Sequence, residues 1–397
     1  MSDRPRRVVL ATRIFAPEAA AATFRLGALV RALAERAEVA VLTTTPPRGL
    51  RGPALQELAG VRVSRWPVLR DATGYVRGYL PYLSFDLPLA VRLLTTRRPD
   101  VVVVEPPPTT GAVVRVVLAL RALTGHRTAY VYYAADVWSD ATASMGAPAP
   151  VVGLMRAVET FALRGARTVV AVSDGVADRV RALTGPRDGP RVVVVPNGID
   201  TDVFTPDGDR HPEAPTAPYL VYAGTASEWQ GAEVFAEAMR EVVRHEPDAR
   251  LIFLGQGSSW PALQRIRASL PEGALELRPL VPPAEAAAWQ RGAAAALVSV
   301  RPGVGYDFAY PTKVIAALAT GAPVVFAGPG PAAQDVRDHG LGAAVPHEVG
   351  AVAGAMLAAV RSGRGEPADV SRRVAWVREH RSLAATGDRA AQVVLPV

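Results

Sequence analysis

The sequence predicts an α/β protein made of two doubly wound, parallel-sheet domains. Short Val-rich runs alternate with segments of helical periodicity along the chain, as is typical of a parallel sheet covered by helices. A polar, Pro-rich stretch at 205–218 interrupts this alternation near the middle. At 397 residues, the chain is also too long for one ordinary hydrophobic core.

The first half reads as one complete series of strands and helices. The strands are short runs rich in β-branched residues, at 8–11, 38–43, 61–65, 101–104, 128–132, 168–172 and 192–195. Helices are expected near 20–36, 79–96, 110–123, 151–163 and 174–183. We assign residues 1–204 to an N-terminal Rossmann-like domain.

The same alternation resumes after 205–218, which has the composition of a linker. Strands are expected at 219–222, 250–254, 275–278, 295–300, 324–327 and 343–345. Helices are expected near 232–244, 260–269, 284–291, 312–320, 332–339 and 349–361, followed by a pair at 369–379 and 383–394. Residues 219–368 then form a second Rossmann-like domain, and 369–397 pack back toward the first. Such domains bind ligands beyond the carboxyl ends of their strands, which predicts a ligand in the cleft between them.

Composition excludes several classes of function. The chain contains no cysteine, which rules out disulfides, thiolate metal sites and a cysteine nucleophile, and fits a reducing cytosol. We see no signal peptide and no run of about 18 apolar residues, so we expect a cytoplasmic protein. The net charge of +7 is explained either by an Arg-rich solvated surface or by attraction to nucleotide diphosphates or anionic lipid headgroups. No basic stripe with interleaved aromatics indicates nucleic-acid binding.

The richest segment for chemistry is the loop and helix start at 301–313. Lys313 is the only lysine of the chain, where every other basic side chain except histidine is arginine. It lies with Pro311 and Thr312 in the first turn of a predicted helix, after a Gly-rich loop that Arg301 opens. Free N–H groups, the helix dipole and an ammonium would meet there, which predicts an anion site. The alternative is an ordinary helix after a loop.

Another candidate loop, 223–231, follows the first strand of the second domain. Gly224 has no side chain, so that a phosphate could approach backbone N–H groups, and Glu228 and Gln230 offer hydrogen bonds.

In the first domain, candidate residues follow two strands. Pro17 and Glu18 lie in the first strand-to-helix turn, and Arg25 lies on the helix after it, where they would line an acceptor pocket or simply form the turn. Asp136 follows the strand at 128–132, with Trp138 close behind. A carboxylate there could accept a proton or bind sugar hydroxyls, or it could cap the next helix.

The chain resembles glycosyltransferase family 4, a family of retaining enzymes with the GT-B fold. The resemblance covers nearly the whole length and rests on VSDGVADRV (172–180), VVVVPNGIDTDVF (192–204), YAGTASEWQGAEVF (222–235) and PTKVIAALATGAPVV (311–325). The segments DVWSD (136–140) and EPPPTTG (105–111) are similar to the N-acetylhexosaminyl- and fucosaminyl-transferase branch, whose acceptors are lipid-linked or small and polar.

The resemblance implies transfer of a sugar from a nucleotide diphosphate donor to a hydroxyl acceptor, with no metal and no cofactor beyond the donor. The acceptor would be a cell-surface glycan, a lipid-linked intermediate or a natural product. Asp136 and Lys313 would be catalytic. The donor would contact a set of residues in the second domain: Gly224, Thr225, Glu228, Gln230, Arg301, Tyr310, Thr312 and Lys313. The acceptor would lie near Pro17, Glu18, Arg25 and Trp138.

The chain also departs from the family pattern. Phe308 and Ala316 occupy the places of two glutamates, the second of which usually holds the ribose hydroxyls. The TASEWQ loop (225–230) lacks the usual Arg and Lys, and Ala135 replaces a histidine before Asp136. Two alternatives therefore stay open, a glycosyltransferase-like binding protein without turnover and a sugar-nucleotide epimerase. The apolar segment 79–94 is either a core helix or a surface that meets lipid at the inner membrane face.

Overall fold

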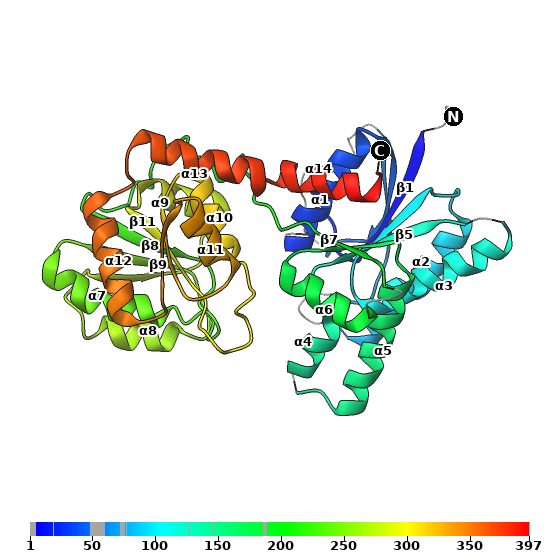
Figure 1. The fold of residues 1–397 in the computed structure, drawn as a ribbon, viewed down its shortest axis with the longest axis horizontal. Helices are drawn as coiled ribbons and strands as arrows, with labels where there is room; N and C mark the ends of the chain where they lie inside the picture. Colours follow the sequence, from blue (N-terminus) through cyan, green and yellow to red (C-terminus); the bar gives the residue numbers. More distant parts are fainter. Residues whose placement is uncertain are drawn as a thin grey trace. The chain divides into compact units, whose positions relative to one another are not determined.

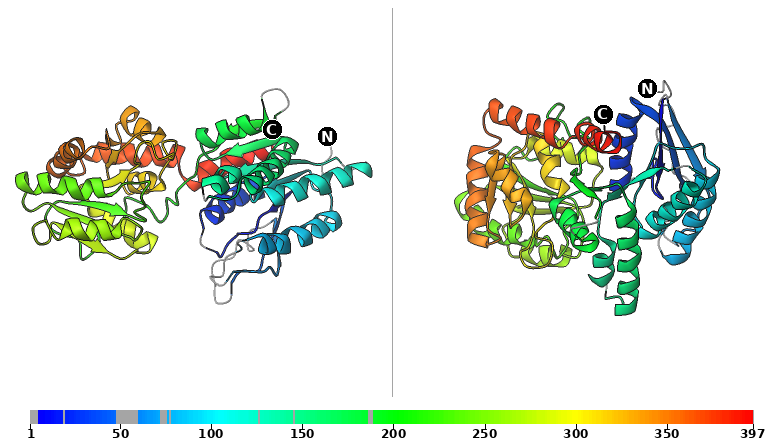
Figure 2. Two further views of the ribbon diagram at one scale, coloured as in Figure 1. Left: turned by 90° about the horizontal axis from the view of Figure 1, so that it is seen from below. Right: turned by 45° about the vertical axis from the view of Figure 1, so that its right-hand side comes forward.

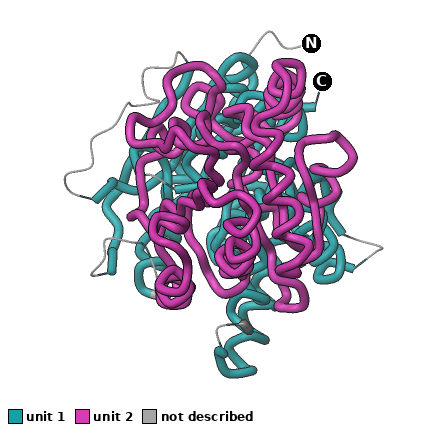
Figure 3. The backbone as a smooth tube through the Cα atoms, turned by 90° about the vertical axis from the view of Figure 1, so that its left-hand side faces the viewer, with its two compact units in different colours: residues 1–197, 383–397 teal, residues 198–382 magenta. Residues whose placement is uncertain are grey.

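The computed structural model describes residues 5–18, 20–47, 60–71, 76, 78–125, 127–144, 146–185 and 189–396. The chain divides into two compact units (Figure 3). Unit 1 combines Met1–Asn197 with Leu383–Val397, and unit 2 is Gly198–Ser382.

Over the described part of unit 1, seven parallel strands form one sheet in the order β3-β2-β1-β4-β5-β6-β7. The strands are β1 (Arg6–Ala11), β2 (Ala37–Thr44), β3 (Val61–Trp66), β4 (Val101–Val104), β5 (Ala129–Ala134), β6 (Thr168–Ala171) and β7 (Arg191–Val194). β4 consists of four buried valines, because a central parallel strand is covered on both faces. The strand order reverses between β1 and β4, so these two strands mark the switch point where such sheets bind ligands.

Helices cover both faces of this sheet. One face carries α1 (Ala21–Ala34) and α14 (Leu383–Val394). The other carries α2 (Tyr79–Thr95), α3 (Pro108–Leu123), α5 (Ala149–Gly165) and α6 (Asp174–Thr184). Strand residues alternate between the two cores: Tyr133 faces the first and Tyr132 the second. The short helix α4 (Trp138–Ser144), absent from the sequence prediction, follows β5.

The pairing of α14 with α1 joins residues from opposite ends of the chain (Figure 1). Ala390, Ala391 and Val394 of α14 are buried in the core beneath α1. Gly387 permits the close approach, because a Cβ at this position would lie 2.7 Å from the Ala28 carbonyl oxygen. The first unit is therefore built from two separate parts of the sequence.

Among the described residues of unit 2, six parallel strands lie in the order β10-β9-β8-β11-β12-β13. They are β8 (Tyr219–Ala223), β9 (Arg250–Leu254), β10 (Leu275–Arg278), β11 (Ala295–Ser299), β12 (Val324–Ala327) and β13 (Gly342–Val345). The order reverses between β8 and β11, which places a second switch point beside Gly224.

Helices also cover both faces of this second sheet (Figure 2). One face carries α7 (Glu233–His245), α8 (Trp260–Arg267) and α12 (Val349–Ser362). The other carries α9 (Pro283–Gly292), α10 (Thr312–Ala319), α11 (Pro331–Asp338) and α13 (Pro367–His380). Helix α10 emerges from the loop after β11 and packs against α9 and α13, so its first turn lies at the ligand-binding edge of the sheet.

The predicted fold class, with two parallel-sheet α/β domains, is confirmed. Residues 205–218, which the sequence assigns to a linker, lie in unit 2. Within that stretch the His211 ring stacks on Trp289, with 4.3 Å between ring centroids, and Glu213 pairs with Arg278. None of the helices in the described ranges is long and apolar enough to cross a bilayer.

Candidate functional site

The first candidate site lies at the switch point of unit 2. Gly224 directly follows β8, and Thr312 and Lys313 begin α10 after the loop that follows β11. A pocket of about 310 Å³ opens here, and its wall includes Gly224, Thr225, Thr312 and Lys313. Apolar side chains form much of the remaining wall, among them Phe204, Leu280, Val281 and Ala316.

Lys313 is half-buried, and its ammonium faces an aromatic ring rather than a carboxylate. Its Nζ lies 5.3 Å from the centre of the Tyr222 ring, within the range of a cation–π contact. None of the residues described in the structure forms an ion pair or hydrogen bond with this ammonium. Burial disfavours the charged form and lowers the pKa of Lys313 from 10.5 to about 8. An anion in the pocket would therefore be the ammonium's counter-charge.

Gly224 makes room for this lysine. A Cβ at this position would lie 2.9 Å from Lys313 Cε, closer than such contacts allow. The glycine also has φ of +116°, a backbone conformation that side chains with a Cβ rarely adopt. The residue therefore brings backbone and ammonium together at one end of the pocket.

The other predicted donor-binding residues lie outside the pocket wall. Gln230 is buried, and its Oε1 accepts a hydrogen bond of 2.8 Å from the Ser227 backbone N–H, which closes the loop on itself. Glu228 is exposed to solvent. The structure thus gives Gln230 a structural partner within its own loop.

Arg301 and Tyr310 each have partners of their own. An Arg301 Nη lies 3.7 Å from an Oε of Glu233, so a neighbouring carboxylate offsets its charge. The Tyr310 hydroxyl donates a hydrogen bond of 2.9 Å to Asp335, and Arg381 lies over the Tyr310 ring while also pairing with Asp335. These contacts tie the loop before α10 to α11 and to the end of α13.

In unit 1, Asp136 and Trp138 lie beyond the carboxyl end of β5. The Asp136 side chain is exposed. It does not cap the next helix, because the Glu159 carboxylate accepts hydrogen bonds of 2.7 and 2.9 Å from the backbone N–H groups of Trp138 and Ser139. The Trp138 ring meets Tyr82 edge-on, with 5.8 Å between centroids.

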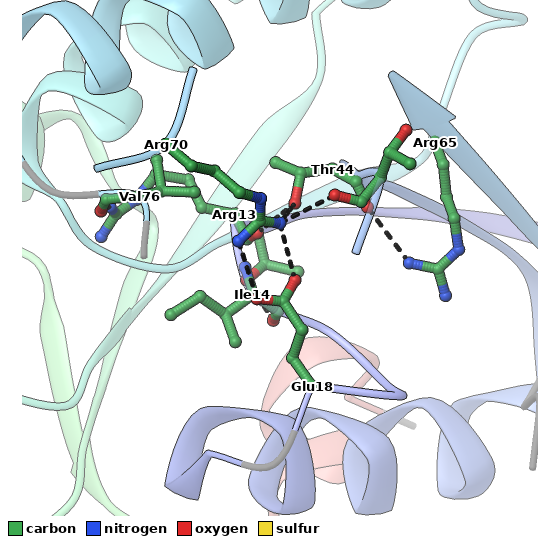
Figure 4. Close-up of polar contacts among 9 residues, drawn as sticks. Arg13, Ile14, Glu18, Thr44, Arg65, Arg70 and Val76 are labelled. Carbon is green, nitrogen blue, oxygen red and sulfur yellow. Dashed lines mark hydrogen bonds and ion pairs between the residues drawn. The ribbon is translucent and has the colours of Figure 1, made fainter. Parts of the chain in front are cut away.

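The predicted acceptor-side residue Glu18 is held by Arg70 in a two-pronged ion pair (Figure 4). Both hydrogen bonds are 3.0 Å long. Arg70 also donates to the Thr44 hydroxyl, so it links the first turn of the unit to the end of β2. Pro17 precedes Glu18 in this turn and is half-buried.

Arg25 and Glu105 form a buried ion pair at the switch point of unit 1. Both side chains are less than a tenth exposed. Glu105 follows β4 and also accepts a hydrogen bond of 3.0 Å from Thr12, which follows β1. Arg25 donates to Asn197 at 3.2 Å and lies over the Tyr133 ring.

Glu105 is not among the site residues that the sequence predicts. Its position directly after a four-valine strand was the available signal, because side chains at the carboxyl end of a central strand face the ligand edge. Over the part of the chain that the structure describes, no group of three His, Asp or Glu side chains has an arrangement that could hold a metal ion.

Each half of the chain matches a known family of glycosyltransferase domains. Residues 21–198 match the glycosyl transferase 4-like domain, and residues 217–362 match glycosyl transferases group 1. A search of curated proteins found no match in sequence.

Solved structures resemble the chain over nearly its whole length. Sucrose-phosphate synthase from Thermosynechococcus elongatus is 16% identical with a TM-score of 0.68, covering 98% of each chain. HepE of Anabaena, in complex with UDP-glucose, is 15% identical with a TM-score of 0.64, covering 98% of this chain and 100% of its own. WaaG, a glycosyltransferase involved in lipopolysaccharide biosynthesis, is 14% identical with a TM-score of 0.65 and the same coverage.

Because these solved structures are only 14–16% identical to the chain, they show its fold alone. The two domain matches identify the kind of domain in each half of the chain. The first match spans β2 to β7 of the first sheet, and the second spans all six strands of the second sheet. The chain therefore carries a glycosyl transferase 4-like domain followed by a glycosyl transferases group 1 domain, and its fold is the GT-B fold of the glycosyltransferase structures to which it is similar.

Proposed function

We propose that this protein is a retaining glycosyltransferase that moves a sugar from a nucleotide diphosphate sugar to a hydroxyl acceptor. The observation that carries the proposal is the unpaired ammonium of Lys313, which lines a pocket beside Gly224 at the switch point of unit 2. HepE and starch synthase IV, two neighbours in fold, are described in complexes with UDP and with ADP. Retention at the anomeric carbon rests on the resemblance to family 4.

In the proposed reaction, unit 2 binds the donor and stabilises the leaving group. The bond from the anomeric carbon to the diphosphate breaks, and negative charge develops on the leaving diphosphate. The acceptor oxygen bonds to the anomeric carbon, and the acceptor's hydroxyl proton passes to the leaving diphosphate. Lys313 and the free N–H groups at the start of α10 would stabilise that charge. This arrangement supports chemistry without a metal, and we propose no cofactor, because the nucleotide sugar is itself a substrate. Asp136, exposed beyond β5, would act near the reacting carbon.

The sugar and the acceptor are proposed from the same resemblance. An N-acetylated hexosamine is the proposed sugar. A cell-surface glycan, a lipid-linked intermediate or a natural product is the proposed acceptor, met by unit 1 near Pro17, Glu18, Arg25 and Trp138. Arg25 and Glu18 are engaged by Glu105 and Arg70, so their proposed role is to shape the acceptor wall.

Nucleotide binding provides the direct test. Calorimetry at pH 7 against UDP, ADP, GDP, CDP and TDP is expected to show binding of at least one. Transfer is then measured with the matching sugar nucleotide and hydroxyl acceptors, and the product's anomeric configuration gives the stereochemistry. Nucleotide binding without any transfer would support a non-catalytic protein, and isomerisation of the sugar without an acceptor would support an epimerase. Absence of binding to the whole panel would contradict the proposed function.

The pH dependence of binding is a further expected result. The ammonium of Lys313 is charged below its pKa of about 8, so this residue itself should cause little change in affinity between pH 6 and 7. Above that pKa, the free protein must take up a proton to bind, and affinity should fall by up to about tenfold per pH unit. Calorimetry in buffers of different ionisation heat, between pH 8 and 9, should detect this uptake. A flat profile from pH 6 to 9.5 would contradict the role of Lys313.

We also propose peripheral membrane contact through α2. This helix exposes an apolar stripe at spacings of three and four residues: Leu80, Leu83, Leu87, Val91 and Leu94. Arg97 and Arg98, both exposed, follow the stripe and would meet anionic headgroups at the inner membrane face.

Flotation with phosphatidylglycerol vesicles tests this contact. The wild type is expected to float and the Leu87→Glu variant to remain in the dense fraction, because a charge in the stripe opposes burial in the bilayer. Val349→Glu is the matched control, since Val349 is an exposed apolar side chain of unit 2. Equal flotation of all three proteins would exclude the stripe as the contact.

A further inference from the structure

One buried polar side chain in the pocket of unit 2 has no partner. Gln290, on α9, is only 2% exposed, and it is one of the residues around the pocket that Lys313 also lines. Its Oε1 is buried and accepts no hydrogen bond, and no described residue bonds to the other end of its amide. A buried amide left unpaired destabilises a fold, so this group calls for an explanation.

A second buried glutamine of the same unit has a hydrogen-bond partner where Gln290 has none. Gln230 is 4% exposed in the same unit, and its Oε1 accepts a hydrogen bond of 2.8 Å from Ser227 N–H. That amide holds a loop together. Gln290 makes no such bond, although its backbone carbonyl does accept one from Arg364. Helix α9 therefore holds the Gln290 side chain in place, but this side chain forms no hydrogen bond with any described residue.

The pocket's polar groups are arranged for a ligand with two different ends. Gly224, Thr312 and Lys313 offer backbone, hydroxyl and ammonium groups to an anion. Helices α9 and α10 pack together, and Ala316 of α10 brings no polar group to the same wall. Besides those three residues, Thr225 and Gln290 are the residues with polar side chains around the pocket, and the other residues that line it have apolar side chains.

We propose that Gln290 is a specificity-determining residue that hydrogen-bonds the nucleoside part of the donor. This inference rests on the proposed function, which places a nucleotide diphosphate in the pocket. An amide both donates and accepts, so it suits either of two nucleoside groups, a ribose hydroxyl or the amide edge of a base. With the diphosphate at Lys313, the nucleoside would fill the apolar part of the pocket and supply the missing partner.

The test compares Gln290→Leu with the wild type. Leucine fills a similar volume without polar atoms, so it removes the hydrogen bond and leaves the wall intact. Binding of UDP, ADP and GDP should weaken by about tenfold for whichever nucleotide the wild type prefers. Binding of inorganic pyrophosphate, which has no nucleoside, should be unchanged. The melting temperature of the ligand-free variant should equal or exceed that of the wild type, because an unpaired buried amide has been removed.

Two analogues separate the possible contacts. If Gln290 binds a ribose hydroxyl, the 2′- or 3′-deoxy form of the preferred nucleotide should bind the wild type as weakly as the natural nucleotide binds Gln290→Leu. If Gln290 binds the base, the variant should lose the wild type's preference among the three bases.

The outcomes distinguish this inference from the function on which it rests. Equal nucleotide affinity in Gln290→Leu and the wild type would overturn the role of Gln290 and leave the proposed function standing. A fall in melting temperature together with weaker pyrophosphate binding would assign Gln290 a structural role. Failure of the wild type to bind any of UDP, ADP, GDP, CDP and TDP would refute the proposed function itself.

Discussion

Replacing Lys313 by methionine is expected to lower both nucleotide affinity and sugar transfer by on the order of 100-fold or more, as removal of one preorganised charge-stabilising donor does in other enzymes. Methionine keeps the unbranched stem that passes Gly224 and removes only the charge. Because no described residue pairs with the ammonium, nothing else in the pocket wall is left unsatisfied by its removal.

The same substitution is expected to stabilise the ligand-free protein near pH 7. Burial lowers the pKa of Lys313 from 10.5 to about 8, so the folded state disfavours the charged form relative to the unfolded state. Below pH 8 that penalty is fully present, and it fades as pH rises from 8 toward 10.5, where the folded protein binds fewer protons than the unfolded chain. Thermal unfolding should therefore show a higher melting temperature for Lys313→Met at pH 7 and a smaller difference at pH 10.

Arginine at position 313 provides the matched control. The guanidinium stays charged across this pH range, so any binding that the Lys313→Arg variant retains should not weaken between pH 8 and 9.5. Its larger planar head must still pass Gly224, so some loss of affinity is expected at pH 7. Wild-type affinity and turnover in Lys313→Met would contradict the assignment of the pocket.

The second large effect concerns the buried ion pair of unit 1. Glu105→Ala should destabilise this unit by about 3–5 kcal/mol, because it leaves the Arg25 guanidinium buried without its counter-charge. Thr12 would also lose a hydrogen-bond acceptor. Urea unfolding followed by circular dichroism measures the loss. Glu38→Ala is the matched control, since Glu38 pairs with Arg7 at the surface of the same unit, and its removal should have a far smaller effect.

A double variant separates the charge from the packing. Arg25→Met combined with Glu105→Leu removes both charges and keeps most of the buried volume, so it should recover much of the stability lost in Glu105→Ala. If Glu105→Ala unfolds at the same urea concentration as Glu38→Ala, the pair does not stabilise the unit as its burial indicates.

The sequence predicts the fold well because each strand or helix is indicated by the composition and spacing of its own residues. Runs such as the four valines of β4 are buried on both faces, and β-branched residues at that density indicate parallel strands without knowledge of their partners. Helix α4 was missed because it spans only seven residues, and the group that caps its N-terminus is Glu159, some 20 positions further along.

The candidate site could be predicted only where sequence position alone fixes geometry. Gly224 directly follows a strand and Lys313 lies in the first turn of a helix, so both belong at the ligand edge of a sheet, and the structure brings them together. The partners of Arg301 and Tyr310 are Glu233 and Asp335, which are distant in sequence and became visible only in the folded chain. Gln290 gave no signal, because an unpaired amide is a property of its surroundings rather than of a motif.

The pairing of α14 with α1 has a consequence for biosynthesis. Part of the core of unit 1 is supplied by residues 390–395, which a ribosome translates after the whole of unit 2, because unit 2 ends at Ser382. N-terminal domains usually fold first during translation. Unit 1 cannot complete its core until unit 2 has been synthesised. Nascent chains arrested before residue 383 should expose the apolar surface of α1 to chaperones, and unit 1 made on its own would need residues 383–397 supplied as a fused segment.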